Sequence, residues 1–436
     1  MTMEKLRTNK MKKKIIEIYH SKTRIDVQWA FFSLLSAGLT YIVLRIIIGK
    51  NLGVSGLGIY TIVYMIYQFG IQFSNFGFGS ALTKYIAENY DDKSLIQKKI
   101  SAGIVGSIIS GLIFSILLFI MSPIISNNVF NTPEMNPLLI ITSFCFPFIS
   151  LQLAVLGIFN GFRQMKSFAS LNIVLNVFII FLSIYFVNIC NLSLFGAVLG
   201  YAIPTCIIGG LSPLLLSKEF TFKRSLFEVS VLKTMSIFGF FFILSTSASF
   251  LNTQVGTFLI GYFLTPIEVG IYSVAITISQ ILIIFPSAIQ RITTPDIANL
   301  YRKKSETKIR KYFFRSMSYS LIACLIIGII IILMGDWLIL NLFSEEFLPA
   351  KKYMIYLIIG NVIFSPVISV GSCFFSMNKF TVPYRINIIS FFLMLLLNFI
   401  LIPSLGIFGA VISTITLQIV LLFIYFAMIW IYTAEE

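Results

Sequence analysis

Long apolar runs alternate with short polar segments from residue 27 to the end of the chain. Runs of about 18 or more apolar residues predict membrane-spanning helices. Backbone polar groups in lipid must be hydrogen-bonded within the segment, so helices are the regular structure that such runs form. The predicted fold is an all-α polytopic membrane protein with about twelve transmembrane helices. The predicted spans are residues 27–49, 57–82, 100–121, 137–159, 169–189, 194–216, 234–260, 268–292, 312–334, 353–376, 385–402 and 405–432.

The composition supports a membrane protein. Hydrophobic residues make up 58% of the chain and charged residues 11%, and the mean hydropathy is +0.94. A soluble domain carries about 25% charged residues. Too few charges are present here to cover a water-soluble surface.

An internal repeat divides the sequence into two similar halves. The segment GIY at residues 58–60 recurs at residues 270–272, and FGAV at residues 195–198 recurs at residues 408–411. Repeats fix architecture, and in transporters the binding site lies where the repeats meet. Six spans in each half predict two parallel-repeat six-helix bundles around a central cavity.

Four segments follow from these patterns. We expect a basic cytoplasmic tail at residues 1–26, a six-helix bundle at 27–216, a cytoplasmic linker at 217–233 and a second six-helix bundle at 234–436. The tail is either a short amphipathic helix on anionic membrane lipids or a disordered segment with a helical end.

The distribution of basic residues predicts the orientation in the membrane. The formal net charge is +15, which in a soluble protein would favour nucleic acid as a partner. Here the N-terminal tail and every second loop after it contain 27 Lys and Arg residues. The loops on the opposite side contain three, which are Lys50, Lys351 and Lys352. By the positive-inside rule both termini are cytoplasmic, in a multi-pass protein of the cell (inner) membrane. The charge therefore reports topology, and no nucleic acid partner is expected.

Constellations of catalytic residues are absent from the sequence. The single histidine, His20, lies in the basic tail, no carboxylate pair falls within a predicted span, and the five cysteines form no CxxC pair. These features argue against an enzyme and against a metal site or cofactor.

Arg45 is the clearest cation inside an apolar run, GLTYIVLRIIIG. One interpretation is an arginine that snorkels to the headgroups. The other is a cation facing a cavity, where its guanidinium group would bind phosphate oxygens. Arg24, Arg291 and Arg315, at the inner ends of spans, are either further cations for such a head group or topology anchors.

Polar side chains follow one face of the second predicted span, at positions 64, 68, 72 and 75. Two more amides fall in the seventh span. Such amides either form hydrogen bonds between helices or line a site for a hydroxyl-rich substrate. The substrate-binding candidates in these spans are Gln68, Gln72, Asn75, Asn252 and Gln254.

Several motifs resemble the bacterial polysaccharide-biosynthesis flippases, the O-antigen and capsule repeat-unit exporters of the multidrug/oligosaccharidyl-lipid/polysaccharide superfamily. They extend over the whole chain in the family's order. In that family an arginine often precedes the glycine turn between the first two helices, and Arg45 occupies this place. The motifs are LRIIIGKNLGVSGLGIY at residues 44–60, FGFGSALTKYIAE at 76–88, FNGFRQMKSFA at 159–169, NLSLFGAVLG at 191–200 and PSLGIFGAVIS at 403–413.

The resemblance implies a flippase that moves a polyprenyl-diphosphate-linked oligosaccharide repeat unit from the cytoplasmic to the outer leaflet by alternating access. It implies a lipid-linked oligosaccharide as substrate, with a polysaccharide polymerase and chain-length machinery as protein partners. A cation-coupled multidrug exporter of the related branch is an alternative, against which the lack of a carboxylate deep in any span weighs. A membrane-embedded polysaccharide polymerase is a third interpretation, although the chain shows no acceptor chemistry.

Overall fold

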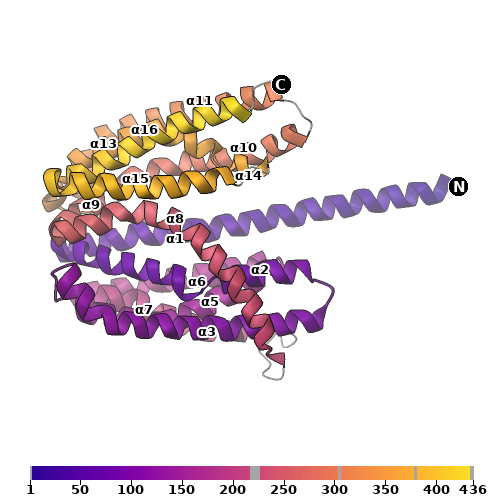
Figure 1. The fold of residues 1–436 in the computed structure, drawn as a ribbon, viewed down its shortest axis with the longest axis horizontal. Helices are drawn as coiled ribbons and strands as arrows, with labels where there is room; N and C mark the ends of the chain where they lie inside the picture. Colours follow the sequence, from indigo (N-terminus) through magenta and orange to yellow (C-terminus); the bar gives the residue numbers. More distant parts are fainter. Residues whose placement is uncertain (1, 217–225, 303–305, 378–380, 433–436) are drawn as a thin grey trace. The chain divides into compact units, whose positions relative to one another are not determined.

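The computed structural model describes residues 2–216, 226–302, 306–377 and 381–432, and only the backbone of residues 2–24. No strand occurs among these residues (Figure 1). The chain is an all-α polytopic membrane protein, as predicted. Its helices are α1 (Thr2–Ser74), α2 (Phe78–Glu88), α3 (Lys93–Ile124), η1 (Ile125–Val129), α4 (Met135–Ser143), α5 (Cys145–Gly161), α6 (Met165–Ile184), η2 (Tyr185–Ile189), α7 (Ser193–Leu211), η3 (Ser212–Leu215), α8 (Val229–Phe263), α9 (Pro266–Ser279), η6 (Gln280–Ile283), α10 (Ile284–Arg302), α11 (Glu306–Leu333), α12 (Gly335–Leu342), η7 (Glu345–Phe347), α13 (Ala350–Val370), α14 (Cys373–Ser376), α15 (Thr381–Leu405) and α16 (Ile407–Tyr432).

Nine helices in the described part of the chain are long and apolar enough to cross a membrane. A tenth crossing results if α4 and α5, which are bent by 40° at their junction, form one span. The stretch Ile25–Glu88 is one of these nine helices, although it contains two of the predicted spans. The segment Val229–Leu244 of α8 is apolar but too short to be included among the nine. The observed helices are therefore consistent with about twelve crossings.

Two breaks interrupt the first predicted spans. Gly53, with φ 67° and ψ −168°, kinks α1 where the first two spans were expected to separate. A second break follows Ser74, because Phe76 and Gly77 both have positive φ angles, of 45° and 69°. The second span thus ends at Ser74 instead of residue 82, and α2 is a separate helix.

The chain forms two compact units, each built from several segments. Unit 1 comprises Met1–Leu44, Tyr67–Ser122 and Asn136–Ile243. Unit 2 comprises Arg45–Ile66, Pro123–Met135 and Leu244–Glu436. Both α1 and α8 contribute residues to each unit.

In unit 1, close packing of α2 on α5 depends on small residues. A Cβ atom added at Gly157 would lie 2.2 Å from the carbonyl oxygen of Gly79. Thr83 donates its hydroxyl proton to the carbonyl oxygen of Gly157 at 3.0 Å. Small residues allow helix backbones to approach closely in a membrane protein. The α2–α5 pair therefore forms a tight interface in this unit, where α7 also packs against α5 and α6.

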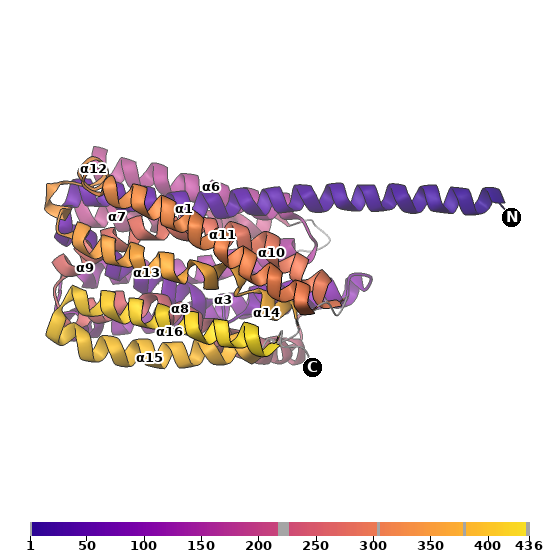
Figure 2. The same ribbon diagram turned by 90° about the horizontal axis from the view of Figure 1, so that it is seen from above.

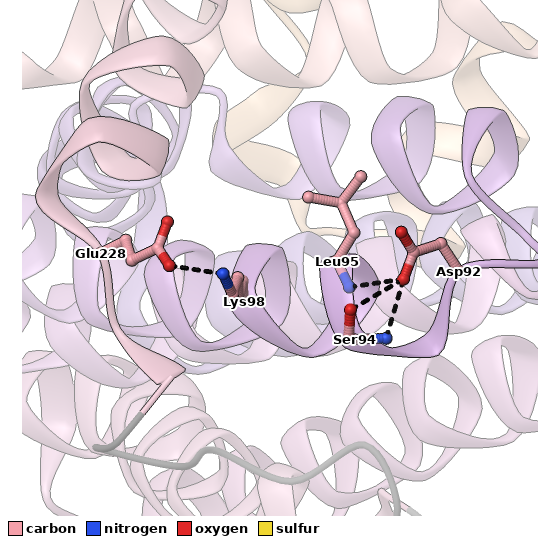
Figure 3. Close-up of polar contacts among 5 residues, drawn as sticks. All are labelled: Asp92, Ser94, Leu95, Lys98 and Glu228. Atoms are coloured by element: carbon pink, nitrogen blue, oxygen red, sulfur yellow. Dashed lines mark hydrogen bonds and ion pairs between the residues drawn. The ribbon is translucent and has the colours of Figure 1, made fainter.

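Polar contacts in unit 1 hold the starts of α3 and α8 (Figure 3). Asp92 caps α3, since its Oδ1 accepts the backbone N–H groups of Ser94 at 3.1 Å and Leu95 at 3.0 Å. The N–H of Leu95, followed by the hydroxyl of Ser94, lowers the pKa of the Asp92 carboxyl group. Lys98 Nζ lies 2.6 Å from Oε1 of Glu228, the residue before α8. This ion pair joins the second turn of α3 to the start of α8.

In unit 2, α13 packs against α9, α10, α11 and α16. Phe313, Phe374 and Tyr425 belong to its buried apolar cluster. The helices α15 and α16 lie along each other in both views (Figures 1 and 2). They are joined at Gly406, whose φ of 62° favours glycine because it has no Cβ atom. These contacts form the scaffold that positions α9.

Candidate functional site

The guanidinium group of Arg45 is buried in unit 2, where α1 meets α9. Arg45 is 8% exposed, and its Nη1 donates to the carbonyl oxygen of Ser273 at 2.9 Å and to Oγ1 of Thr277 at 2.8 Å. Thr277 donates its own hydroxyl proton to the Ser273 carbonyl oxygen at 2.7 Å, so toward Arg45 it acts as the acceptor. A side chain buried in this way does not snorkel to the headgroups.

The chemistry of this contact suits an anion. A guanidinium group stays protonated in proteins and carries five N–H donors in a planar fork. The two oxygens that Nη1 contacts are neutral, so these two bonds orient the group without neutralising its charge. Such a group can form two parallel N–H bonds to the oxygens of a carboxylate or a phosphate.

The start of α9 fixes the register of this contact. Glu268 Oε2 accepts the backbone N–H of Thr265 at 3.0 Å, as part of a capping box. Pro266 occupies the start of the helix, where its fixed φ angle favours helix initiation. Ser273 and Thr277 lie four residues apart on the same face of α9. The carbonyl oxygen of Ser273 and the hydroxyl of Thr277 can therefore both contact Arg45.

The repeated glycines pack directly against each other in unit 2. A Cβ atom at Gly58 would lie 1.7 Å from the carbonyl oxygen of Pro266, and one at Gly270 would lie 2.1 Å from that of Val54. The nitrogen of Gly270 is 3.1 Å from the same Gly58 Cβ position. The GIY motifs of the two halves therefore form one crossing of α1 with α9, close to the Arg45 contact in sequence.

Asn172 and Asn387 occupy matching positions in the two halves of the repeat, and each contacts a helix of its own unit. In unit 1, Asn172 on α6 donates to Ser33 Oγ on α1 at 3.2 Å. In unit 2, Asn252 on α8 donates to the carbonyl oxygen of Asn387 on α15 at 3.0 Å. Asn252 Oδ1 is buried and accepts no hydrogen bond from the described residues. Asn252, a predicted substrate-binding residue, thus contributes to packing between helices.

The amides predicted on the second span do not lie along one uninterrupted helix. Gln68 and Gln72 are half-buried on α1, but Asn75 lies in the turn after its end. Ser107 on α3 donates to Asn75 Oδ1 at 3.3 Å. Asn75 therefore holds this turn against α3 within unit 1.

The remaining predicted residues occupy other places. Gln254 is half-buried on α8, and Arg291 is exposed on α10. The side chain of Arg24 lies outside the described part of the structure. Arg315 is exposed on α11, where its Nε donates to Tyr319 Oη at 3.0 Å. None of these three described residues takes part in the Arg45 contact.

A buried polar network in unit 2 was not predicted. Asn361 on α13 donates to the carbonyl oxygen of Ser279 at 3.1 Å and accepts from Gln418 on α16 at 2.9 Å. Asn361 and Gln418 each stand in a long apolar run of the sequence, and this was the signal that could have identified them. The network ties the end of α9 to two neighbouring helices.

Comparisons with known proteins agree with this fold. Residues 27–300 match the family model described as polysaccharide biosynthesis protein, and residues 234–400 match the model described as MatE. A solved structure described as the lipid II flippase MurJ in an inward closed conformation superposes with a TM-score of 0.76, at 15% identity, over 92% of this chain and 87% of that one. At that identity the likeness concerns the fold alone.

Two curated relatives match part of the chain. The probable low-salt glycan biosynthesis flippase Agl15 of Haloferax volcanii is 28% identical over 199 residues, which are 45% of this chain and 40% of the relative. The capsular polysaccharide biosynthesis protein CapF of Staphylococcus aureus is 24% identical over 185 residues, 42% of this chain and 46% of the relative. The chain thus spans less than half the length of these relatives.

Proposed function

Because the chain belongs to the polysaccharide biosynthesis protein family, whose model matches residues 27–300, we propose that it is a lipid-linked oligosaccharide flippase. Its substrate would be a polyprenyl-diphosphate-linked repeat unit, moved from the cytoplasmic to the outer leaflet for surface polysaccharide assembly. The observation that carries the proposal is this family match. The flippase named among its relatives supports it.

In this proposal Arg45 receives the diphosphate of the substrate. The support is its permanent charge within an apolar run and its orientation by Ser273 and Thr277. Gln68, Gln72 and Gln254 would contact sugar hydroxyls, with Asn75 and Asn252 holding the helices that carry them. Arg24 and Arg291 would attract the head group at the inner ends of the spans.

The proposed mechanism is alternating access between two six-helix halves, residues 27–216 and 234–436, joined by the linker at 217–233. The multi-pass protein would lie in the inner membrane with both termini cytoplasmic. The concentration of Lys and Arg in alternate loops supports this orientation. A polysaccharide polymerase and chain-length machinery would receive the exported unit, and the protein itself would catalyse no covalent step.

The proposal is tested by deleting the gene and analysing lipid-linked oligosaccharides. We expect surface polysaccharide to be lost and the lipid-linked unit to accumulate on the cytoplasmic leaflet, because its synthesis continues while its export stops. Re-expression of the wild-type chain should restore both. Normal surface polysaccharide in the deletion strain would contradict the proposal.

A second candidate is a cation-coupled multidrug exporter, which the MatE match over residues 234–400 favours. It is distinguished by drug susceptibility of the same deletion strain. An exporter of this kind would leave surface polysaccharide intact and would increase sensitivity to cationic drugs. A flippase would show the opposite pattern.

A further inference from the structure

A pocket of about 400 Å³ opens in unit 2 between α10 and α11. Ligand pockets have volumes of about 300–1,000 Å³, so a small head group fits. Six of its seven described lining residues have a polar or charged group, although much of the exposed lining is the apolar part of these side chains. The polar lining residues are Asp296, Asn299, Lys308, Lys311, Tyr312 and Arg315.

Three cations of the pocket share one stripe of α11. Lys308, Lys311 and Arg315 stand at positions i, i+3 and i+7, with Tyr312 at i+4, so their side chains leave the helix on one face. The first and last cations are separated by two helical turns, about 10 Å of rise. The stripe is longer than a single phosphate group can contact.

The pocket carries an excess of positive charge. Among the lining residues that the structure describes, three cations face one carboxylate, that of Asp296, which accepts the hydroxyl proton of Tyr312. In the described part of the chain, neither lysine forms an ion pair. Arg315 is oriented by the bond from its Nε to Tyr319 Oη at 3.0 Å, and this bond does not use the two Nη groups.

The stripe is not a consequence of the internal repeat. The pair Lys93-Ser94 recurs as Lys304-Ser305, so Lys311 and Arg315 correspond to Ile100 and Ile104 of the first half. Topology requires only that positive charge lie near this end of the helices. Topology alone does not require three cations on one face of a helix beside a pocket, so this arrangement indicates a further role.

We propose that the pocket between α10 and α11 binds a diphosphate group. Two linked phosphates carry oxygens far enough apart to reach cations on both turns, with Lys308 and Lys311 on one and Arg315 on the other. Charge-assisted bonds from lysine and arginine suit phosphate oxygens. The diphosphate belongs either to a free soluble compound or to the head of a polyprenyl lipid, and the site is separate from the Arg45 contact.

The test is calorimetric titration of the full chain in phosphatidylcholine nanodiscs. The probes are pyrophosphate, farnesyl diphosphate and inorganic phosphate. We expect both diphosphates to bind more tightly than inorganic phosphate, because only they reach both turns. Equal affinity for the two diphosphates would indicate that the natural ligand is a free soluble diphosphate. Tighter binding of farnesyl diphosphate would indicate that it is the head group of a polyprenyl lipid. Equal binding of all three probes, or no binding, would overturn the inference.

Two variants and a matched control link the binding to the pocket. K308Q/K311Q should weaken diphosphate binding by about tenfold or more, whereas K166Q/K233Q, which removes two exposed lysines of unit 1, should not change it. D296N should tighten binding by about threefold, since it removes a negative charge from the described lining. A gain of affinity cannot come from misfolding. Unchanged affinity in both pocket variants would refute the site.

The Arg45→Gln variant separates this inference from the proposed function. It should lose transport and keep diphosphate binding at the pocket. If K308Q/K311Q does not alter binding while transport of the wild-type chain is intact, the inference fails and the flippase proposal stands. If the diphosphates bind as expected but the protein moves no lipid-linked unit, the flippase proposal is wrong and the diphosphate site is still supported.

Discussion

At the scale of single residues, Arg45 combines two roles in one contact. Its hydrogen bonds to Ser273 and Thr277 connect α1 with α9, and in the proposed function its guanidinium group also binds the substrate diphosphate. The sequence predicted an unusual cation at this place. It could not predict the partners, because they are a carbonyl group and a hydroxyl group more than 220 residues away. Such neutral partners leave no charge pattern in a sequence.

Replacing Arg45 separates the two roles. In Arg45→Lys the charge is kept, but one ammonium group cannot reproduce the planar fork, so we expect transport to fall while the protein folds. In Arg45→Gln the charge is lost and transport should be abolished. Stability should fall by about 1–3 kcal/mol, the cost of breaking buried hydrogen bonds to a charged group. Transport in reconstituted vesicles and thermal unfolding in detergent measure the two effects.

Thr277→Val provides the control for this experiment. It removes the hydroxyl acceptor and keeps both the shape of the side chain and the charge of Arg45. We expect a loss of stability with transport largely retained. Full transport by folded Arg45→Gln would show that the charge has no role in binding the substrate.

At the scale of helices, backbone conformation and close packing determine where elements end and meet. The apolar runs predicted the helices well. The break after Ser74 was missed although Gly77, one of its two residues with a positive φ angle, is a glycine. The other is Phe76, and phenylalanine does not normally signal such a conformation. The repeated GIY motif was recognised, but its meaning, the crossing of α1 and α9 at Gly58 and Gly270, appears only in three dimensions.

The crossing predicts a large effect for one added methyl group. Gly58→Ala would place a Cβ atom against the carbonyl oxygen of Pro266, and α1 and α9 would have to move apart. We expect the variant to lose about 1–3 kcal/mol of stability, as overpacked interiors do. Thermal unfolding of the purified protein measures this loss.

Gly38→Ala is the matched control, because Gly38 also lies on α1 but a Cβ atom there would meet nothing within 4 Å. Its free energy of unfolding should equal that of the wild-type protein or exceed it by about 0.5–1 kcal/mol, since alanine favours the helix. Equal effects of the two substitutions would contradict the close crossing.

At the scale of the whole molecule, the sequence predicted the fold class and the approximate number of crossings because both depend on hydropathy. The two compact units could not be predicted from the repeat alone. Residues 45–66 and 123–135 belong to unit 2 although they come from the first half of the chain. Contacts between distant segments decide such membership, and local patterns do not contain them.

A native cysteine tests the proposed orientation. Cys190 is the exposed one of the five cysteines, and it lies between the fifth and sixth predicted spans, on the side opposite the basic loops. With both termini cytoplasmic, a membrane-impermeant maleimide should label it in intact cells. Mass spectrometry of the purified protein detects the label, and Cys190→Ser should abolish it. If Cys190 is labelled only in permeabilised cells, the orientation in the membrane is the opposite of the one proposed.

The membership of residues 45–66 in unit 2 has a consequence during synthesis. A ribosome completes Gly58 about 212 residues before Gly270, and at about 5–20 residues per second this interval lasts roughly ten to forty seconds. For that time the glycine face of α1 has no partner to cover it. The nascent chain must therefore keep this surface sheltered, in lipid or by the insertion machinery, until α9 emerges.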